Sequence, residues 1–156
     1  MKATSHIYPG AHTLNVYITL KDCKKAIDWY KKVFGAKEIG MLTMPDGKIG
    51  HGEIEIEGSL LMVADENLEW GNKAPETIGG NPASLALYVK DCDAFFKKAV
   101  DAGATVVMPV ADQFYGDRSG QVMDPFGYKW SIITHIEDMS FEEMQKRMEK
   151  AFAEQK

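Results

Sequence analysis

The chain has 156 residues, 45% of them hydrophobic and 26% charged, which is the composition of an ordinary globular protein. This length suits one domain, so we expect a single domain over residues 1–156. The net charge of -5, without a cluster of Lys or Arg, offers no positive field for nucleic acid or for an anionic membrane surface.

Features of membrane and secreted proteins are also lacking in the sequence. No apolar run approaches the roughly 20 residues that cross a bilayer, and residues 1–13 lack the apolar stretch of a signal peptide. Cys23 and Cys92 are too few for a disulfide scaffold and have no metal-binding spacing. We therefore expect a cytoplasmic protein with neither nucleic acid nor membrane as a partner.

The first half of the chain predicts one strand, one helix and three further strands. Residues 13–20 alternate between polar and apolar side chains, which predicts a strand. A helix is expected from near Asp22, whose carboxylate suits free N–H groups, to Gly35, which suits a helix end. The later strands are expected at about 37–44, 48–57 and 59–65, with turns at Pro45-Asp46-Gly47 and Glu57-Gly58.

The second half repeats this pattern. Residues 84–92 align with residues 15–23 at an offset of 69 (84 − 15), and the triplet Lys-Asp-Cys is identical in both. A helix stripe of Phe95, Phe96, Ala99 and Val100 precedes Gly103, and strands are expected at about 105–111, 118–124 and 128–135. We therefore predict an α+β fold with βαβββ modules at 12–65 and 83–136, joined by a linker at 66–82.

A last helix is predicted over residues 139–154. Ser140 and Glu143 have the spacing of a capping box, which marks a helix start. The helix carries an apolar stripe formed by Phe141, Met144, Met148, Ala151 and Phe152. This stripe needs a covering surface, either the sheet of its own chain or a second copy of the protein.

The polar faces of the two sheets are the expected ligand site. Each module has a helix for only one face of its sheet, so the other face must meet something else. Two such sheets side by side can form a concave pocket. We expect this pocket to hold a small organic molecule.

Two motifs in the sequence carry a family resemblance. One is Ala26-Ile27-Asp28-Trp29-Tyr30 running into Val33-Phe34-Gly35-Ala36, and the other extends from Tyr115 through Asp124-Pro125-Phe126-Gly127 to Trp130. Over about residues 12–139 the chain resembles the PhnB-like branch of the vicinal oxygen chelate superfamily, which contains glyoxalase I, bleomycin-resistance proteins and extradiol dioxygenases. The resemblance implies two βαβββ modules forming a concave mixed sheet, a ligand site within that sheet and a homodimer.

The resemblance also implies where a metal would bind. In metal-dependent members each module supplies a His or Gln from its first strand and a Glu from its last strand to a divalent metal. The matching positions here are Asn15 and Ser84 on the first strands and Met62 and Ser131 on the last strands. Such side chains bind divalent cations far more weakly. We therefore expect these four residues to line the pocket as ligand-binding residues, without a metal.

His51 and Glu53 are candidates for catalytic residues. A two-residue turn at Glu57-Gly58 would place Glu53 opposite Met62, with His51 on the same face about 7 Å away. The pair could act as an acid–base couple or as half of a relocated metal site. The alternative is a solvated polar stripe that continues along the strand.

Aromatic and basic residues complete the expected ligand site. Tyr17, Tyr88 and Tyr115 offer flat walls with a hydroxyl group, although buried tyrosines are also ordinary core residues. Arg118 could bind a carboxylate, phosphate or phosphonate group of a ligand, or it could pair with Asp117 or Asp124.

The tryptophans and the other histidines have less definite roles. Trp29 and Trp130 are expected to pack in the core, and Trp70 is expected to act as a lid or a hydrophobic plug in the linker. His135, like His6 and His12, has no partner that the sequence identifies.

Two functions remain open at this point. The first is a binding protein for a small organic ligand that works without a metal or another cofactor. The alternative is a metal-dependent lyase, isomerase or dioxygenase that uses His51 and Glu53 with a further donor. A third possibility is a protein whose role is assembly through its last helix. The apolar stripe of that helix is explained more simply by docking within the expected homodimer.

Overall fold

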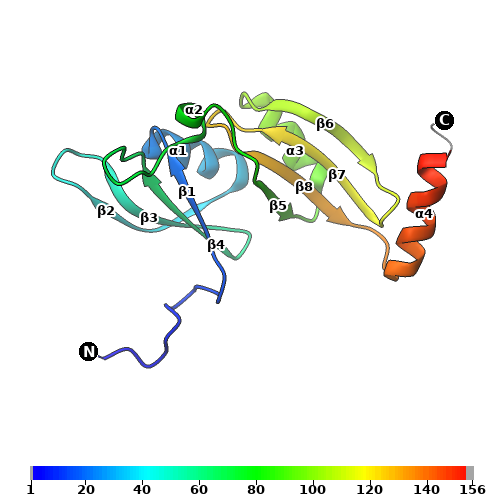
Figure 1. Cartoon of the computed structure of the whole chain (residues 1–156), viewed down its shortest axis with the longest axis horizontal. Coiled ribbons are helices and arrows are strands. Elements are labelled where there is room, and N and C mark those ends of the chain that lie inside the picture. The colour runs from blue at the N-terminus through cyan, green and yellow to red at the C-terminus, as the bar shows by residue number, and fades with distance from the viewer. Residues whose placement is uncertain (1, 154–156) are drawn as a thin grey trace. The chain divides into compact units, whose positions relative to one another are not determined.

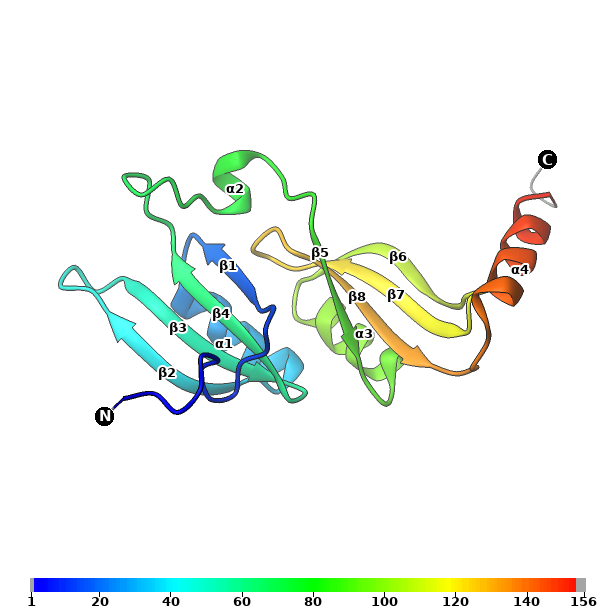
Figure 2. The same ribbon diagram turned by 60° about the horizontal axis from the view of Figure 1, so that its bottom comes forward.

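The computed structural model describes residues 2–153 and divides into two units, one ending at Gly80 and one beginning at Asn81. Each unit contains one four-stranded mixed sheet, and each sheet has a helix packed on one face (Figures 1 and 2). No helix in the described part of the chain is long and apolar enough to span a membrane.

The first unit contains one βαβββ module followed by a short helix. Its elements are β1 (Val16–Leu20), α1 (Cys23–Phe34), β2 (Lys37–Thr43), β3 (Ile49–Ile56), β4 (Ser59–Asp65) and α2 (Pro75–Ile78). The strand order is β1-β4-β3-β2, with β1 parallel to β4 and the other pairs antiparallel. β4 is therefore a central strand between β1 and β3.

The second unit repeats this topology and adds the last helix. Its elements are β5 (Ser84–Tyr88), α3 (Cys92–Asp101), β6 (Thr105–Asp112), β7 (Asp117–Met123), β8 (Lys129–His135) and α4 (Phe141–Ala153). The strand order is β5-β8-β7-β6, with β5 parallel to β8. The α+β class, the two βαβββ modules and the last helix are thus confirmed.

The helices of the modules begin and end where the sequence predicts. The Asp22 carboxylate accepts a hydrogen bond from Lys25 N at 3.0 Å, and Asp91 accepts one from Ala94 N at the same distance. Gly35 ends α1 with φ of 67°, a conformation that L-residues with a side chain adopt at a cost. Glu143 N donates to the Ser140 hydroxyl, which confirms the predicted start of α4.

The core of the first module lies between α1 and one face of the sheet. Tyr30 and Phe34 of α1 are fully buried, as are Leu20, Ile54 and Val63 of the strands. Because side chains alternate along a strand, the neighbouring residues of β3 and β4 point to the opposite, polar face. That face carries the candidate site.

The first strand is shorter than the sequence predicts. It begins at Val16 rather than at residue 13, and Leu14, expected on the apolar face, is 89% exposed. The Asn15 side chain accepts a hydrogen bond from His12 N at 2.8 Å and donates one to His12 O at 2.5 Å. This local turn competes with strand pairing and explains the late start.

The Asp124-Pro125-Phe126-Gly127 motif is a buried turn. The Asp124 carboxylate, 3% exposed, accepts hydrogen bonds from Phe126 N and Tyr128 N at 2.9 Å each and from Trp130 Nε1 at 2.8 Å. Trp130 is 4% exposed, so its predicted packing role is confirmed. This part of the motif that carries the family resemblance therefore stabilises the fold.

Both cysteines are buried at the first position of their helices. Burial, with the nearby Asp65 and Asp22 carboxylates, raises the pKa of Cys23 to about 12. The Cys23 thiol therefore stays protonated at neutral pH, which makes it a poor nucleophile.

Replacing Asp124 with Ala is expected to lower the free energy of unfolding by about 3 kcal/mol, because three buried N–H groups lose their acceptor. Urea denaturation followed by circular dichroism measures the change. Asp101→Ala is the control, since Asp101 belongs to an exposed ion pair with Lys97 that contributes less than about 1 kcal/mol. Equal losses in the two variants would contradict the structural role of Asp124.

Candidate functional site

Three side chains form a hydrogen-bonded chain on the polar face of the first sheet. The Tyr17 ring stacks on the His51 ring with centroids 5.6 Å apart, and its hydroxyl lies 3.1 Å from His51 Nδ1. His51 Nε2 lies 3.2 Å from Glu53 Oε1. The predicted His51–Glu53 pair therefore forms, and Tyr17 extends it by one link that the sequence did not indicate.

The order of donors and acceptors along this chain follows from the chemistry of Tyr17. Burial raises the pKa of the Tyr17 phenol, which stays protonated and can donate to His51 Nδ1. In a neutral imidazole, Nε2–H then donates to the Glu53 carboxylate. The chain can pass a proton between a carboxylate and a phenol, which is what acid–base chemistry requires.

Exposure falls along the chain from Tyr17 to Glu53. Tyr17 is 47% exposed, the His51 side chain 34% and the Glu53 side chain 12%. Met62 lies opposite Tyr17 on one side and opposite Glu53 on the other, as the predicted turn at Glu57-Gly58 requires. The surface that a ligand could contact is therefore formed mainly by Tyr17, His51 and Met62.

The second module has different side chains at the matching places. Ala86, Ser131 and Gln121 lie opposite one another across β5, β8 and β7, as Tyr17, Met62 and Glu53 do in the first module. Gln121 Nε2 donates to Ser131 Oγ at 3.2 Å. This register confirms that Met62 and Ser131 are equivalent and identifies Gln121 as a residue of that face.

The side chains present do not fit the divalent metal that the resemblance implies. The Asn15 amide is engaged by the His12 backbone, and the Ser131 hydroxyl by Gln121. Ser84, at the start of β5, adds only a hydroxyl, and Met62 adds a thioether. Within each module these positions lack the imidazole and carboxylate that hold such ions. Across residues 2–153, no group of three or more His, Cys, Asp or Glu has the geometry of a metal site.

Arg118 pairs with carboxylates other than those expected. Its guanidinium donates from Nε and Nη2 to the two Asp93 oxygens at 2.6 and 2.7 Å, and from Nη1 to Asp112 at 2.8 Å. The prediction that Arg118 pairs with Asp117 or Asp124 was wrong. The pairing joins α3 to β6 and β7, and ligand binding by Arg118 stays a prediction.

His135 belongs to a cluster that the sequence analysis did not find. His135 Nδ1 lies 2.7 Å from Asp117 Oδ1, and its Nε2 lies 2.9 Å from Asp138 Oδ1. The Tyr88 hydroxyl donates to Asp117 Oδ2 at 3.3 Å. The sequence contained a signal for only one of these contacts. Asp138 is three residues from His135, whereas Asp117 lies on the neighbouring strand and is distant in the sequence.

Tyr115, the remaining tyrosine among the ligand-binding candidates, is half-buried in the loop between β6 and β7. Its ring packs edge to face against Phe114 at a centroid distance of 5.1 Å. Its role in ligand binding, like that of Tyr88, stays a prediction.

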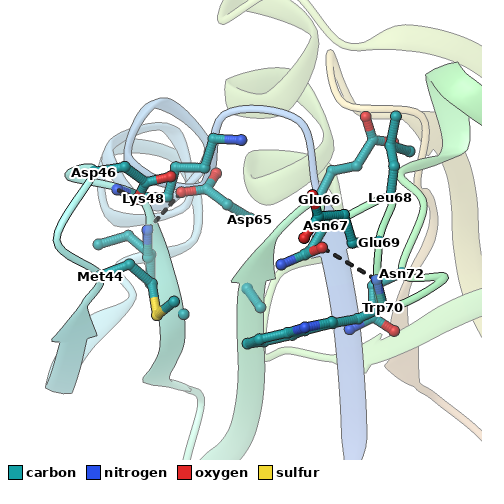
Figure 3. A pocket seen from close by; sticks show the side chains of 13 residues that line it. Met44, Asp46, Lys48, Asp65, Glu66, Asn67, Leu68, Glu69, Trp70 and Asn72 are labelled. Atoms are coloured by element: carbon teal, nitrogen blue, oxygen red, sulfur yellow. Dashed lines mark hydrogen bonds between the residues drawn. The ribbon is translucent and has the colours of Figure 1, made fainter.

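A cavity of about 400 Å³ lies within the first unit, at one end of the sheet. The residues that line it include Met44, Asp46, Lys48, Ile49, Gly50, Ala64, Asp65, Glu66, Asn67, Leu68, Glu69, Trp70 and Asn72. Figure 3 shows the Trp70 indole along one side of this space, with Asp46, Lys48 and Asp65 across from the Glu66–Asn72 loop. Trp70 thus lines a cavity of the first unit, whereas the sequence suggested a lid or a hydrophobic plug without locating this cavity.

Comparison with known proteins agrees with this fold. The model of the Glyoxalase/Bleomycin resistance protein/Dioxygenase superfamily matches residues 11–132. An uncharacterized protein of Mycobacterium bovis is 40% identical over 138 residues, which cover 86% of this chain and 91% of that protein. The chain therefore belongs to the glyoxalase/bleomycin resistance protein/dioxygenase superfamily.

Solved structures of related fold include TioX from Micromonospora, which is 27% identical with a TM-score of 0.61, over 83% of this chain and 100% of that one. The PhnB protein of Bacillus cereus is 15% identical with a TM-score of 0.62, over 79% and 99% of the two chains. At 15% identity this second likeness concerns the fold alone.

His135 is expected to titrate above its ordinary pKa of about 6.5, because the hydrogen bonds that its ring N–H groups donate to Asp117 and Asp138 favour the imidazolium. A group with a raised folded-state pKa stabilises the fold fully below its unfolded-state pKa and loses this contribution as the pH rises through the folded-state value. NMR titration of the His135 ring measures the pKa, and Asp138→Asn should lower it. A pKa that this substitution leaves unchanged would contradict the role of Asp138.

Proposed function

We propose that this protein binds a small organic ligand on the polar face of its first sheet, without the metal used by other members of the superfamily. The observation that carries the proposal is the identity of the residues at the positions where metal-dependent members have their metal ligands. These residues are Asn15, Met62, Ser84 and Ser131. Amide, thioether and hydroxyl groups favour contact with an organic molecule over coordination of a divalent ion.

The Tyr17–His51–Met62 surface has the properties of a small-molecule site. The partly exposed Tyr17 ring offers an apolar plane with a hydroxyl at its edge, and Met62 offers a flexible, polarisable surface. His51 is held by hydrogen bonds on both ring nitrogens, so this plane is fixed before a ligand arrives. A pre-ordered surface reduces the entropy cost of binding.

A metal-dependent lyase, isomerase or dioxygenase is the second candidate. The observation in its favour is the His51–Glu53 contact, because an imidazole and a carboxylate at 3.2 Å could share an ion. Metal binding would require His51 to exchange one of its two hydrogen-bond partners for the ion. The direct contacts of His51 therefore favour the metal-free proposal.

Two measurements on the purified protein test the proposal. After dialysis against a chelator and then against Mn²⁺, Ni²⁺ or Zn²⁺, the protein is expected to retain far less than one equivalent of metal. A small-molecule screen by thermal shift identifies a ligand. Tyr17→Ala is expected to lower the affinity for this ligand about tenfold, which corresponds to about 1.4 kcal/mol of binding free energy. Tyr8→Ala, which removes an exposed tyrosine outside the sheet, is the control.

Stoichiometric metal that is retained by the original chain and lost in His51→Ala would overturn the proposal in favour of the enzyme. A ligand whose affinity changes equally in the Tyr17 and Tyr8 variants would place binding elsewhere on the protein.

We also propose that the chain forms a homodimer through α4. No residue of α4 is buried, and its terminal aromatic residues Phe141 and Phe152 are 88% and 60% exposed. Arg147 of the helix pairs with Glu137 in the preceding segment and with Glu143 one turn earlier in the helix, at distances of 2.7 to 2.9 Å. A helix fixed in this way presents its apolar stripe to a partner, and a second copy is the partner always present.

Sedimentation at micromolar concentration is expected to give twice the monomer mass of 17.4 kDa. Replacing Phe141 and Phe152 with Ser should shift the equilibrium toward monomer, because burying each ring contributes roughly 1.5 to 3 kcal/mol. The control is Lys150→Ser, which alters a charged residue of the same helix. A monomer of the original chain would refute the dimer, and a dimer unaffected by the double substitution would exclude α4 as its interface.

A further inference from the structure

The cavity beside Trp70 has the size and pre-formed walls of a ligand site. Its volume of about 400 Å³ lies within the range of roughly 300 to 1,000 Å³ that is usual for small-molecule pockets. Three segments of the first unit line it: the turn between β2 and β3, the end of β4, and the loop at 66–72. All three belong to the first unit, so the cavity does not depend on the second unit.

Hydrogen bonds fix the loop that carries Trp70. The backbones of Asn67 and Asn72 exchange two hydrogen bonds of 3.0 Å each, and Trp70 N donates to Asn67 Oδ1 at 3.1 Å. Ala74 N donates to Glu66 Oε2 at 2.8 Å and holds the far side of the loop. The loop is therefore ordered although its largest side chain faces solvent.

Trp70 is 65% exposed on this ordered loop. An indole has a large apolar surface, and leaving it in water forgoes the stabilisation that burial would provide. Packing in a plug would bury the ring, so the predicted plug role is not what the ring does here. An exposed aromatic face beside a cavity is instead suited to stacking with a flat ligand.

The ionised groups around the cavity are mostly acidic. Asp46, Asp65, Glu66 and Glu69 contribute four carboxylates, whereas Lys48 contributes one ammonium group. Two of the carboxylates accept hydrogen bonds from neighbouring groups and stay ionised. Asp65 accepts from Cys23 N at 2.7 Å and Ile49 N at 2.6 Å, and hydrogen bonds from Thr77 and Ala74 hold the pKa of Glu66 below its usual range. A negative surplus remains, and Glu69 lies beside Trp70 on the same loop.

We propose that this cavity binds a planar aromatic cation, with its ring stacked on Trp70 and its positive charge facing Glu69 and Glu66. Stacking on an indole and attraction to carboxylates act together on such a ligand, because a cation also interacts favourably with the ring face of Trp. An anion of the same shape would meet three more carboxylates than ammonium groups (4 − 1).

This inference rests on the proposed function, since it names the ligand class of the same sheet face. Ala64 lines the cavity and, two residues beyond Met62 on β4, points to the same side of the sheet. A ligand that stacks on Trp70 can therefore extend along the sheet toward Met62 and Tyr17.

Two probes of the same shape separate charge from stacking. N-methylquinolinium is a planar cation, and quinoline is its uncharged analogue at pH 7.5. Each is titrated into ¹⁵N-labelled protein while the indole N–H signals are followed, and Trp70→Phe identifies the Trp70 signal. The cation is expected to shift this signal and to bind at least tenfold more tightly than quinoline, with an affinity that falls as salt is added.

Matched variants locate the interaction. Trp70→Ala is expected to abolish detectable binding of N-methylquinolinium, and Glu69→Gln to weaken it about threefold. Glu142→Gln, which removes an exposed carboxylate of α4, should leave the affinity unchanged. Because Trp70 and Glu69 are exposed, their substitution is expected to leave the fold intact, and a thermal melt checks this.

The inference is overturned if quinoline binds as tightly as the cation, or if the Trp70 signal does not move. Neither result contradicts the proposed function if the affinity of a ligand from the screen still falls in the Tyr17→Ala variant. Binding of the cation that needs Trp70 supports the cavity whether or not Tyr17→Ala affects it, because the ligand from the screen tests the proposed Tyr17 surface separately.

Discussion

Each module depends on one hydrogen bond that ties the start of its helix to the end of its last strand. Cys23 N donates to the Asp65 carboxylate at 2.7 Å, and Cys92 N donates to the Thr134 hydroxyl at 2.9 Å, with 42 residues between the partners in both cases. The bond satisfies a free N–H group at the helix start and fixes the helix above the parallel strand pair. The last strand is a central strand of its sheet, with one face in the core and the other on the polar side.

The two modules share this bond but differ in the side chains that the bond positions. In the first module the last strand ends in Asp65, whose second oxygen accepts from Ile49 N at 2.6 Å and holds the start of β3. In the second module Thr134 instead donates to Val89 O at 2.9 Å. The first module also has Tyr17 and Glu53 where the second has Ala86 and Gln121. Repetition thus preserved the backbone, while the polar faces carry different titratable groups. The first sheet has Tyr17, His51 and Glu53, and the second has Tyr88, Asp117 and His135.

Patterns that are local in the chain predicted most of the fold. The helix start at Asp22, the turn at Glu57-Gly58 and the order of elements within each module depend on short stretches of sequence, and each was confirmed. The errors occurred where side chains from separate segments meet. Arg118 pairs with Asp93, 25 residues away in the sequence, although Asp117 and Asp124 are closer to it in the sequence. His135 pairs with Asp117 on another strand. The Trp70 cavity requires three segments at once, so no single stretch of sequence could indicate it.

The hydrogen bonds of His51 bear both on the absence of metal-binding side chains and on the class of organic molecule that the protein could bind. An imidazole that holds a metal must leave one ring nitrogen free for the ion, and a second group usually orients the other nitrogen. In this chain Tyr17 and Glu53 engage both nitrogens, so His51 acts as a fixed part of the sheet surface. Glu53 is mostly shielded and its charge is directed toward His51, whereas the carboxylates near Trp70 lie around an open cavity. Negative charge at the cavity is therefore more accessible than that of Glu53, and an organic cation can reach it without displacing a hydrogen bond of the sheet.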